Sequence, residues 1–122
     1  IIGKKLPDNC AEDSNSFLKE LLNPDHEKVR APIIHHSSSG RFAIREGPWK
    51  LIMEGRKPRE KRELYNLNDD PSEKKNLIKS FPKIESELTK KITKLINDGR
   101  STPGKPMKHD TPPWPDLVWM KK

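Results

Sequence analysis

The sequence predicts a small α+β domain in which a four-stranded antiparallel sheet is covered on one face by a long C-terminal helix. Four short runs rich in β-branched and aromatic residues lie between residues 31 and 67, with polar turns between them. From Pro82 onward, apolar residues recur at steps of four, four, three and one, which is the spacing of one helix face. The chain has 122 residues, of which 30% are hydrophobic and 35% charged, so we expect one domain rather than two.

A short amphipathic helix is expected over residues 14–22, before the strands. Its four apolar residues fall on one stripe: Phe17, Leu18, Leu21 and Leu22. Asp13 or Ser14 can accept hydrogen bonds from the first free amides of this helix. Pro24 should end it, because proline disfavours a helical residue before it.

The four β-rich runs are residues 31–36, 41–45, 49–53 and 63–67. Residues 37–40 and 46–48 are short enough to close hairpins, whereas the charged segment 54–62 is a long loop, so the runs should form an antiparallel meander. One face of this sheet should be buried, because large apolar residues alternate with their neighbours along the second and third runs: Phe42 and Ile44, then Trp49, Leu51 and Met53.

The segment after the strands begins as a turn. Asp70 can cap a single helical turn, with Pro71 at its first position and Glu73 reaching back, that ends near Asn76. The long helix begins at Pro82 and ends where Gly99 supplies a left-handed conformation. Its apolar stripe should pack on the meander: Ile84, Leu88, Ile92, Leu95 and Ile96.

Beyond Arg100 the chain holds five of its twelve prolines, so we expect an extended tail. Trp114 and Trp119 should anchor this tail on its own domain, because two free tryptophans would favour aggregation. The single domain, residues 1–122, then has four parts: an N-terminal helix and linker (1–27), the β-meander (28–67), a loop with the C-terminal helix (68–99) and the Pro-rich tail (100–122).

The charge of the chain is unevenly spread. The net charge is +7, and the segment from Lys28 to Arg62 carries all of it, with ten basic and three acidic residues. Such a segment can attract phosphates, sulfates or other anions, or it can simply be a solvated surface. Nucleic acid is the less favoured partner, because the segment lacks the interleaved aromatic residues on which bases stack.

Several classes of protein are excluded or disfavoured. No apolar run approaches the roughly 20 residues that a membrane-spanning helix needs. The lone cysteine, Cys10, excludes an internal disulfide and a thiolate metal cluster, and its sequence neighbours include no cation that would activate its thiol. The chain also lacks the phosphate-loop, dinucleotide and zinc-protease motifs.

His35 and His36, followed by the serine-rich turn 37–40, form the one cluster that resembles a site. Adjacent strand residues point to opposite faces, so the two imidazoles should not bind one metal ion. Two interpretations remain open: either both histidines only pack, or one of them faces a substrate at the end of the strand.

Motifs along the chain resemble one family. They are H-H-S-S-S-G-R-F-A-I-R-E-G-P-W-K-L-I (35–52), E-L-Y-N-L-N-D-D-P-S-E-K-K-N-L (63–77), the long helix, and D-G-R-S-T-P-G (98–104). In this order they resemble the C-terminal subdomain of arylsulfatases, in the formylglycine-dependent sulfatase family. The segment E-D-S-N-S-F-L-K-E-L-L (12–22) is similar to the helix that precedes that subdomain, so the resemblance covers about residues 6–110.

The resemblance implies a small antiparallel sheet with a packed helix, attached to a large α/β catalytic domain that hydrolyses sulfuric esters. It also implies that the catalytic domain uses calcium and a formylglycine made from the cysteine of a C-x-P-S-R or C-x-A-S-R signature. Cys10 is followed by A-E-D-S and cannot be that cysteine, so no catalytic residue, metal ligand or cofactor is expected in this chain.

The expected partners follow from the same resemblance. The chain should be inactive alone, pack on the catalytic domain of a longer chain, and meet anionic sulfated substrate through it. The absence of a starting methionine fits a chain cut from a longer one, and an isolated piece that exposes its packing surface should self-associate. Family habit implies the periplasm or secretion, and aryl sulfates, sulfated sugars and mucin or algal glycans all remain candidate substrates.

His35 or His36 would then touch the non-sulfated part of the substrate, with the turn 37–40 at the mouth of the active site. The alternative is a basic binding module for nucleic acid or a sulfated polysaccharide, and a third interpretation is a purely structural module.

Overall fold

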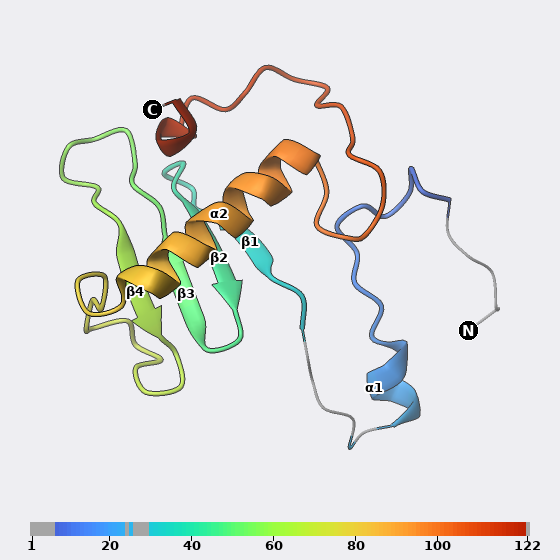
Figure 1. Cartoon of the computed structure of the whole chain (residues 1–122), viewed down its shortest axis with the longest axis horizontal. Helices are drawn as coiled ribbons and strands as arrows, with labels where there is room; N and C mark the ends of the chain where they lie inside the picture. Colours follow the sequence, from blue (N-terminus) through green and yellow to red (C-terminus); the bar gives the residue numbers. More distant parts are fainter. Residues whose placement is uncertain (1–6, 24, 26–29, 122) are drawn as a thin grey trace.

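The computed structural model describes residues 7–23, 25 and 30–121. Two residues named in the sequence analysis lie outside the described residues: Pro24, expected to end the first helix, and Lys28, the start of the basic segment. Most of the linker before the strands and the last residue of the tail also lie outside them. The elements are α1 (Leu18–Leu22), β1 (Ile33–His36), β2 (Phe42–Glu46), β3 (Trp49–Ile52), β4 (Glu63–Asn66), α2 (Pro82–Asp98) and the 3₁₀ helix η1 (Val118–Lys121). The predicted α+β class is confirmed (Figure 1).

The strands form an antiparallel meander in the order β1-β2-β3-β4. The register places Ile34 opposite Ile44, Ile44 opposite Leu51, and Leu51 opposite Leu64, so one row of aliphatic side chains crosses the sheet. Ile44, Leu51 and Leu64 are completely buried. The alternation along β2 and β3 therefore predicted the buried face correctly, since side chains two residues apart share a face.

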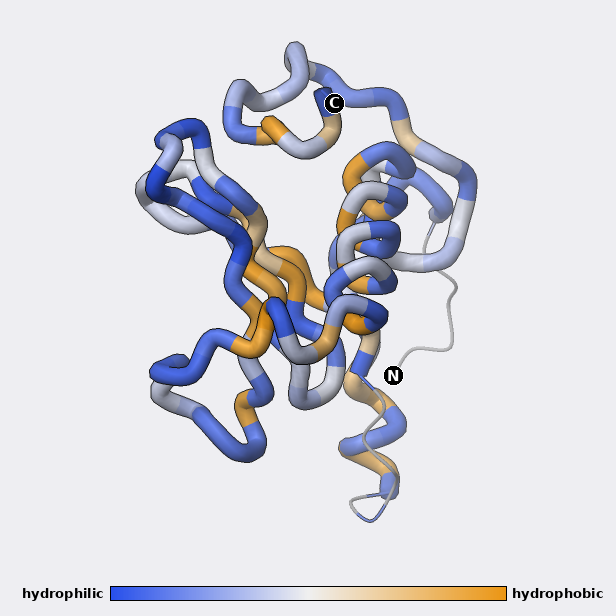
Figure 2. The backbone as a smooth tube through the Cα atoms, turned by 60° about the vertical axis from the view of Figure 1, so that its left-hand side comes forward, coloured by the Kyte–Doolittle hydropathy of each residue, from blue (hydrophilic) through white to orange (hydrophobic). Residues whose placement is uncertain are grey.

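Helix α2 covers this face and lies across the strands (Figure 1). Leu88 and Ile92 are buried at its centre, and Ile84, Leu95 and Ile96 pack beside them. Full burial of one such side chain contributes about 1.5–3 kcal/mol. Gly99 ends the helix in the left-handed region, with φ 65°, as the sequence predicts. In Figure 2 the hydrophobic stretches of α2 and of the strands meet between the two layers.

The Pro-rich tail returns over the domain. Leu117 and Trp119 are buried in the core, and the Trp119 indole donates a hydrogen bond of 3.1 Å to Thr93 Oγ1 on α2. The predicted anchoring of the tail is thus confirmed at Trp119, whereas Trp114 remains 52% exposed. The short helix η1, which carries the anchor, was not predicted.

Helix α1 is shorter than predicted, and residues 14–17 are not part of it. Asp13 does not cap it, because its carboxylate accepts hydrogen bonds from Ser101 N and Oγ at 3.0 and 2.9 Å. Three residues of the expected buried stripe are exposed instead: Phe17 (67%), Leu21 (58%) and Leu22 (77%). Figures 1 and 2 both show α1 standing apart from the sheet and α2.

The predicted helical turn near residues 70–76 is wrong. Glu73 has a φ of +54°, which no right-handed helix accommodates, and its carboxylate lies 2.7 Å from Lys50 Nζ on β3 instead of reaching back. Asp70 Oδ2 accepts the amide of Lys75, so the segment is a turn held by tertiary contacts. Asn76 fixes it to β4 by accepting the amide of Leu64.

Candidate functional site

His35 and His36 lie on opposite faces of β1, as the alternation predicted. His36 shares the α2 side of the sheet with Ile34, whereas His35 lies opposite Ala43 and points to the other side. The His36 ring packs against two aromatic rings, with centroids 4.5 Å from Phe42 and 4.8 Å from Trp114. The two imidazoles therefore cannot share a metal ion, and only His36 joins a cluster.

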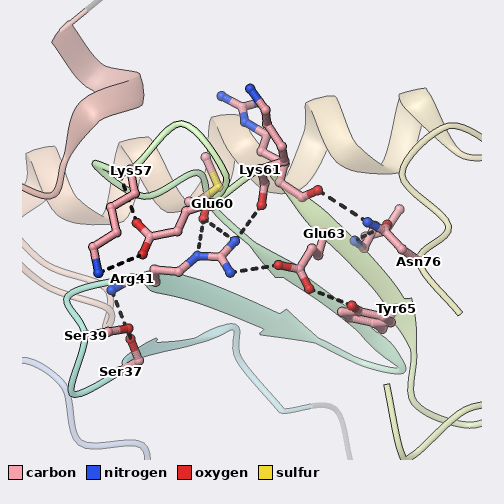
Figure 3. A network of polar contacts seen from close by, with 12 residues as sticks. Ser37, Ser39, Arg41, Lys57, Glu60, Lys61, Glu63, Tyr65 and Asn76 are labelled. Atoms are coloured by element: carbon pink, nitrogen blue, oxygen red, sulfur yellow. Dashed lines mark hydrogen bonds and ion pairs between the residues drawn. The ribbon is translucent and has the colours of Figure 1, made fainter. Parts of the chain in front are cut away.

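The turn after His36 is held by a dense set of hydrogen bonds. Ser37 N donates to Arg41 O at 2.9 Å, and Gly40 N donates to Ser37 O at 3.0 Å. Ser37 Oγ accepts the Arg41 amide and contacts Ser39 Oγ, both at 3.0 Å. Gly40 has a φ of +91°, and a Cβ there would lie 2.7 Å from the Asp116 carboxyl group. The structure therefore requires glycine at this position, and the turn presents fixed hydroxyl groups (Figure 3).

A cavity of about 700 Å³ opens beside His36. Its walls come from β1, from the C-terminal end of α2 and from the tail, and they are largely apolar. His36 and Trp114 form part of one wall, and Arg30 and His109 supply polar groups. A cavity of this size and character can accommodate a ligand or a side chain of another protein segment.

Arg41 ties together the sheet end that carries this turn (Figure 3). Its guanidinium donates to Met53 O at 3.0 and 3.2 Å and to Lys61 O at 2.6 Å, and it pairs with Glu63 at 2.7 Å. Glu63 also accepts the Tyr65 hydroxyl at 2.6 Å. These bonds fix both ends of the β3–β4 loop to the start of β2.

The network shifts two pKa values. Burial raises the pKa of Glu63, but the hydrogen bonds from Tyr65 and Arg41 outweigh it, so this pKa lies below its usual range. Burial, together with the hydrogen bond to the Glu63 carboxylate, raises the pKa of Tyr65 to about 12. Glu63 therefore stays ionised and Tyr65 stays protonated at neutral pH, which suits a structural clamp.

Arg62 forms a second clamp, between the β3–β4 loop and α2. Its guanidinium pairs with Glu54 and Glu85 and donates to Thr89 Oγ1 at 3.3 Å. Burial lowers the pKa of Arg62, but the hydrogen bonds to both carboxylates outweigh it and the pKa is raised. The cation is therefore internally neutralised, and part of the basic segment seen in the sequence is not available to a partner.

Arg100 is a buried functional candidate that was not predicted from the sequence. Its guanidinium donates to Asp8 O, Thr102 O and Lys105 O at 2.9–3.2 Å and pairs with Asp8 Oδ1 at 3.2 Å. Arg100 is only 7% exposed, so the D-G-R-S-T-P-G motif links the end of α2 to the N-terminal segment. The sequence did offer one signal for its burial: Arg100 stands between Gly99 and Pro103, inside a short motif of turn-forming residues.

Within residues 7–23, 25 and 30–121, no three His, Cys, Asp or Glu side chains gather to hold a metal ion. Across the same ranges, no helix is long and apolar enough to cross a membrane. Cys10 is exposed, and it is flanked by Asn9 and Ala11 rather than by a base.

Two comparisons find related proteins, although no family model matches the chain. An N-acetylgalactosamine-6-O-sulfatase of Bacteroides thetaiotaomicron is 31% identical over 101 residues, an alignment that covers 73% of this chain and 20% of that protein. A solved Bacteroides thetaiotaomicron structure, described with the metabolism of multiple glycosaminoglycans, superposes with a TM-score of 0.65 at 30% identity. The superposition covers 75% of this chain and 21% of the solved one.

The chain thus spans about a fifth of the length of the relatives that it matches. The sequence comparison and the fold comparison point to the same relationship, which agrees with the resemblance noted from the sequence. This chain is a sulfatase-related domain, consistent with the C-terminal subdomain that its motifs resemble.

Proposed function

We propose that this chain is the C-terminal subdomain of a larger sulfuric ester hydrolase and acts by packing on the catalytic domain. The observation that carries the proposal is the segment of helix α1 with the preceding Phe17, which exposes Phe17, Leu21 and Leu22 and lies apart from the sheet. Soluble domains rarely leave such a cluster uncovered, since each exposed side chain forgoes the free energy of burial. The relatives are about five times longer than the matched part, and that remainder is the occupant that we assign to this surface.

The chain alone is inactive in this proposal. Its residues do not fit the groups that the catalytic domain would use, because Cys10 lacks the formylglycine signature and no calcium-binding cluster forms among the described residues. The nucleophile and any metal ion would come from the catalytic domain. The substrate class is a sulfated sugar, which the names of the relatives support.

The end of β1 borders the substrate cleft in this proposal. The rigid turn 37–40 and the His36 side chain support it, because both are fixed and both are accessible. If the longer enzyme carries this geometry, His36→Ala should lower kcat/KM for sulfated sugars, and His35→Ala serves as the comparison on the opposite face. Unchanged kcat/KM for both variants on every substrate tested would leave both histidines with a packing role only.

The deciding experiment for the whole proposal is to sequence the native reading frame upstream of the codon for Ile1. A long α/β pattern with C-x-P-S-R or C-x-A-S-R is the expected result, and it would identify the catalytic domain. A start codon and signal peptide directly before Ile1 would overturn the proposal, and the basic binding module would then become the leading function.

A further inference from the structure

The β3–β4 loop, residues 54–62, lies at the same end of the sheet as the β1–β2 turn. This follows from the meander, in which alternate connections share an end, and Figure 3 shows Arg41 between Lys61 of the loop and Ser37 and Ser39 of the turn. Arg41 joins the two connections directly, because its amide donates to Ser37 Oγ and its guanidinium donates to Lys61 O. The loop is therefore held in place beside the proposed cleft.

The acidic residues of this loop are already used within the domain. Glu54 pairs with Arg62, which also pairs with Glu85. Glu60 accepts the Lys57 amide at 3.1 Å, with Lys57 Nζ at 3.8 Å, and its side chain is only 16% exposed. The carboxylates of the loop therefore face inward, toward partners that neutralise them.

The cations of the loop face outward. Arg56, Arg59 and Lys61 are exposed, and within the part of the chain that the structure describes none of the three pairs with a carboxylate. Lys57 is 61% exposed and contacts Glu60 only at 3.8 Å. Elsewhere in the described part of the basic segment, Arg41, Lys50 and Arg62 form ion pairs, and Arg30 and Arg45 are exposed. The loop therefore carries the largest group of exposed cations in this segment.

The same loop borders a shallow cavity of about 380 Å³. Four cations line it, which outnumber its two carboxylates, Glu54 and Glu60, and Val118 of the tail completes the wall: Arg56, Lys57, Lys61 and Arg62. Cations around a concave surface raise the local potential and recruit anions more strongly than the same cations on a flat surface. No aromatic side chain is among the residues that line this cavity, so the surface recognises charged groups rather than stacked bases.

We infer that the cationic rim formed by Arg56, Lys57, Arg59 and Lys61 binds sulfate groups of a sulfated polysaccharide, outside the position where an ester is cleaved. The inference rests on the proposed function for the choice of polymer, since a sulfatase of polymeric substrates meets several sulfate groups at once. The rim would bind sulfate groups that are not being hydrolysed, while the turn 37–40 faces the sugar unit whose sulfate ester lies in the cleft.

The test uses the isolated chain and chondroitin sulfate, with binding measured by fluorescence anisotropy of a labelled polymer at 50 and 200 mM salt. The variant Arg56→Ser/Arg59→Ser/Lys61→Ser removes three rim charges and leaves Lys57, which supports the loop. The matched control is Lys79→Ser/Lys83→Ser/Lys90→Ser, which removes the same net charge from exposed positions on and before α2. Circular dichroism and thermal unfolding verify that both variants fold.

The rim variant should lose at least about tenfold in affinity at 50 mM salt and become less salt-dependent, because fewer counterions are released on binding. The control variant should lose less than about threefold in affinity at the same salt concentration and keep its salt dependence, because its three lysines lie away from the rim. Equal losses in the two variants would overturn the inference, because net charge alone would then explain binding. Absent binding of the unmodified chain, or tighter binding of a 20-base-pair DNA duplex than of chondroitin sulfate, would overturn it as well.

These outcomes are separate from those of the proposed function. A rim that fails to bind leaves the upstream reading frame and the exposed surface of α1 untouched. A missing catalytic domain, in turn, leaves polysaccharide binding by the isolated chain measurable.

Discussion

The exposed surface of α1 gives the most direct test of how this domain is used. Replacing Leu21 and Leu22 by serine removes most of the exposed aliphatic surface from a helix that stands apart from the sheet and α2 (Figure 1). If α1 is a docking surface, the isolated chain should self-associate through it, and the double variant should be more monomeric. The fold itself should not change, because neither residue belongs to the core.

The expected magnitude follows from the exposed fractions. Leu21 is 58% exposed and Leu22 is 77% exposed, and full burial of a leucine is worth about 1.5–3 kcal/mol. Covering both residues should therefore stabilise a complex by about 2–4 kcal/mol per copy, before the entropic cost of association. Since 1.4 kcal/mol is tenfold in a dissociation constant, the variant should weaken self-association by at least about tenfold.

Sedimentation velocity over a hundredfold range of protein concentration measures this effect. Lys19→Ser is the matched control, because Lys19 lies on the same helix and is exposed but carries no large apolar surface. The reasoning is refuted if the unmodified chain stays monomeric at the highest concentration, or if the control shifts the distribution as much as the double variant does.

Three further predictions concern the core, the clamp and the candidate site. Ile92→Ala should lower the free energy of unfolding by about 2–5 kcal/mol in urea titrations, because Ile92 is completely buried between α2 and the sheet, and a loss below 1 kcal/mol would contradict that packing. The raised pKa of Tyr65, about 12, means that the unfolded tyrosine ionises first, so stability should fall by about 2–3 kcal/mol as pH rises from 10 to 12. Tyr65→Phe should remove this part of the pH dependence, and an unchanged profile would contradict the clamp. His36→Ala should lower the free energy of unfolding by about 1 kcal/mol, because its ring contacts with Phe42 and Trp114 are lost. His35→Ala, on the opposite face, should change it by less than about 0.5 kcal/mol. Equal effects of the two variants would mean that the contacts with Phe42 and Trp114 contribute nothing.

Periodicity predicted those parts of the fold in which one element packs on another. The alternation in β2 and β3 and the helical stripe of α2 each record which side chains face the core, so the pair Ile44 and Leu51 could be inferred without coordinates. The opposite orientations of His35 and His36 follow from the same rule. This information is local, because a side chain two residues away on a strand shares a face whatever the rest of the chain does.

Local capping rules failed where a distant partner competes for the cap. Asp13 binds Ser101, 88 residues away, and Glu73 binds Lys50 on a neighbouring strand, so neither side chain serves the helix start that its sequence context favours. The contact of His36 with Trp114 was equally beyond reach, since the path of the tail is set by burial of Trp119 in the core. Such contacts depend on tertiary structure that a window of neighbouring residues does not contain.

The two proposed surfaces differ in chemistry and in position, and this separation supports assigning them to different partners. Helix α1 and the preceding Phe17 expose aliphatic and aromatic side chains beyond the start of β1, whereas the cationic rim lies at the end of the sheet where β1 finishes (Figure 1). An apolar surface gains most from a permanently docked protein partner that excludes water from it. A rim of exposed cations stays hydrated and binds a polyanion by releasing counterions, so its binding is reversible and salt-dependent. A catalytic domain docked on α1 would therefore leave the rim open to solvent, so that the same small domain could hold its enzyme at one end and its polyanionic substrate at the other.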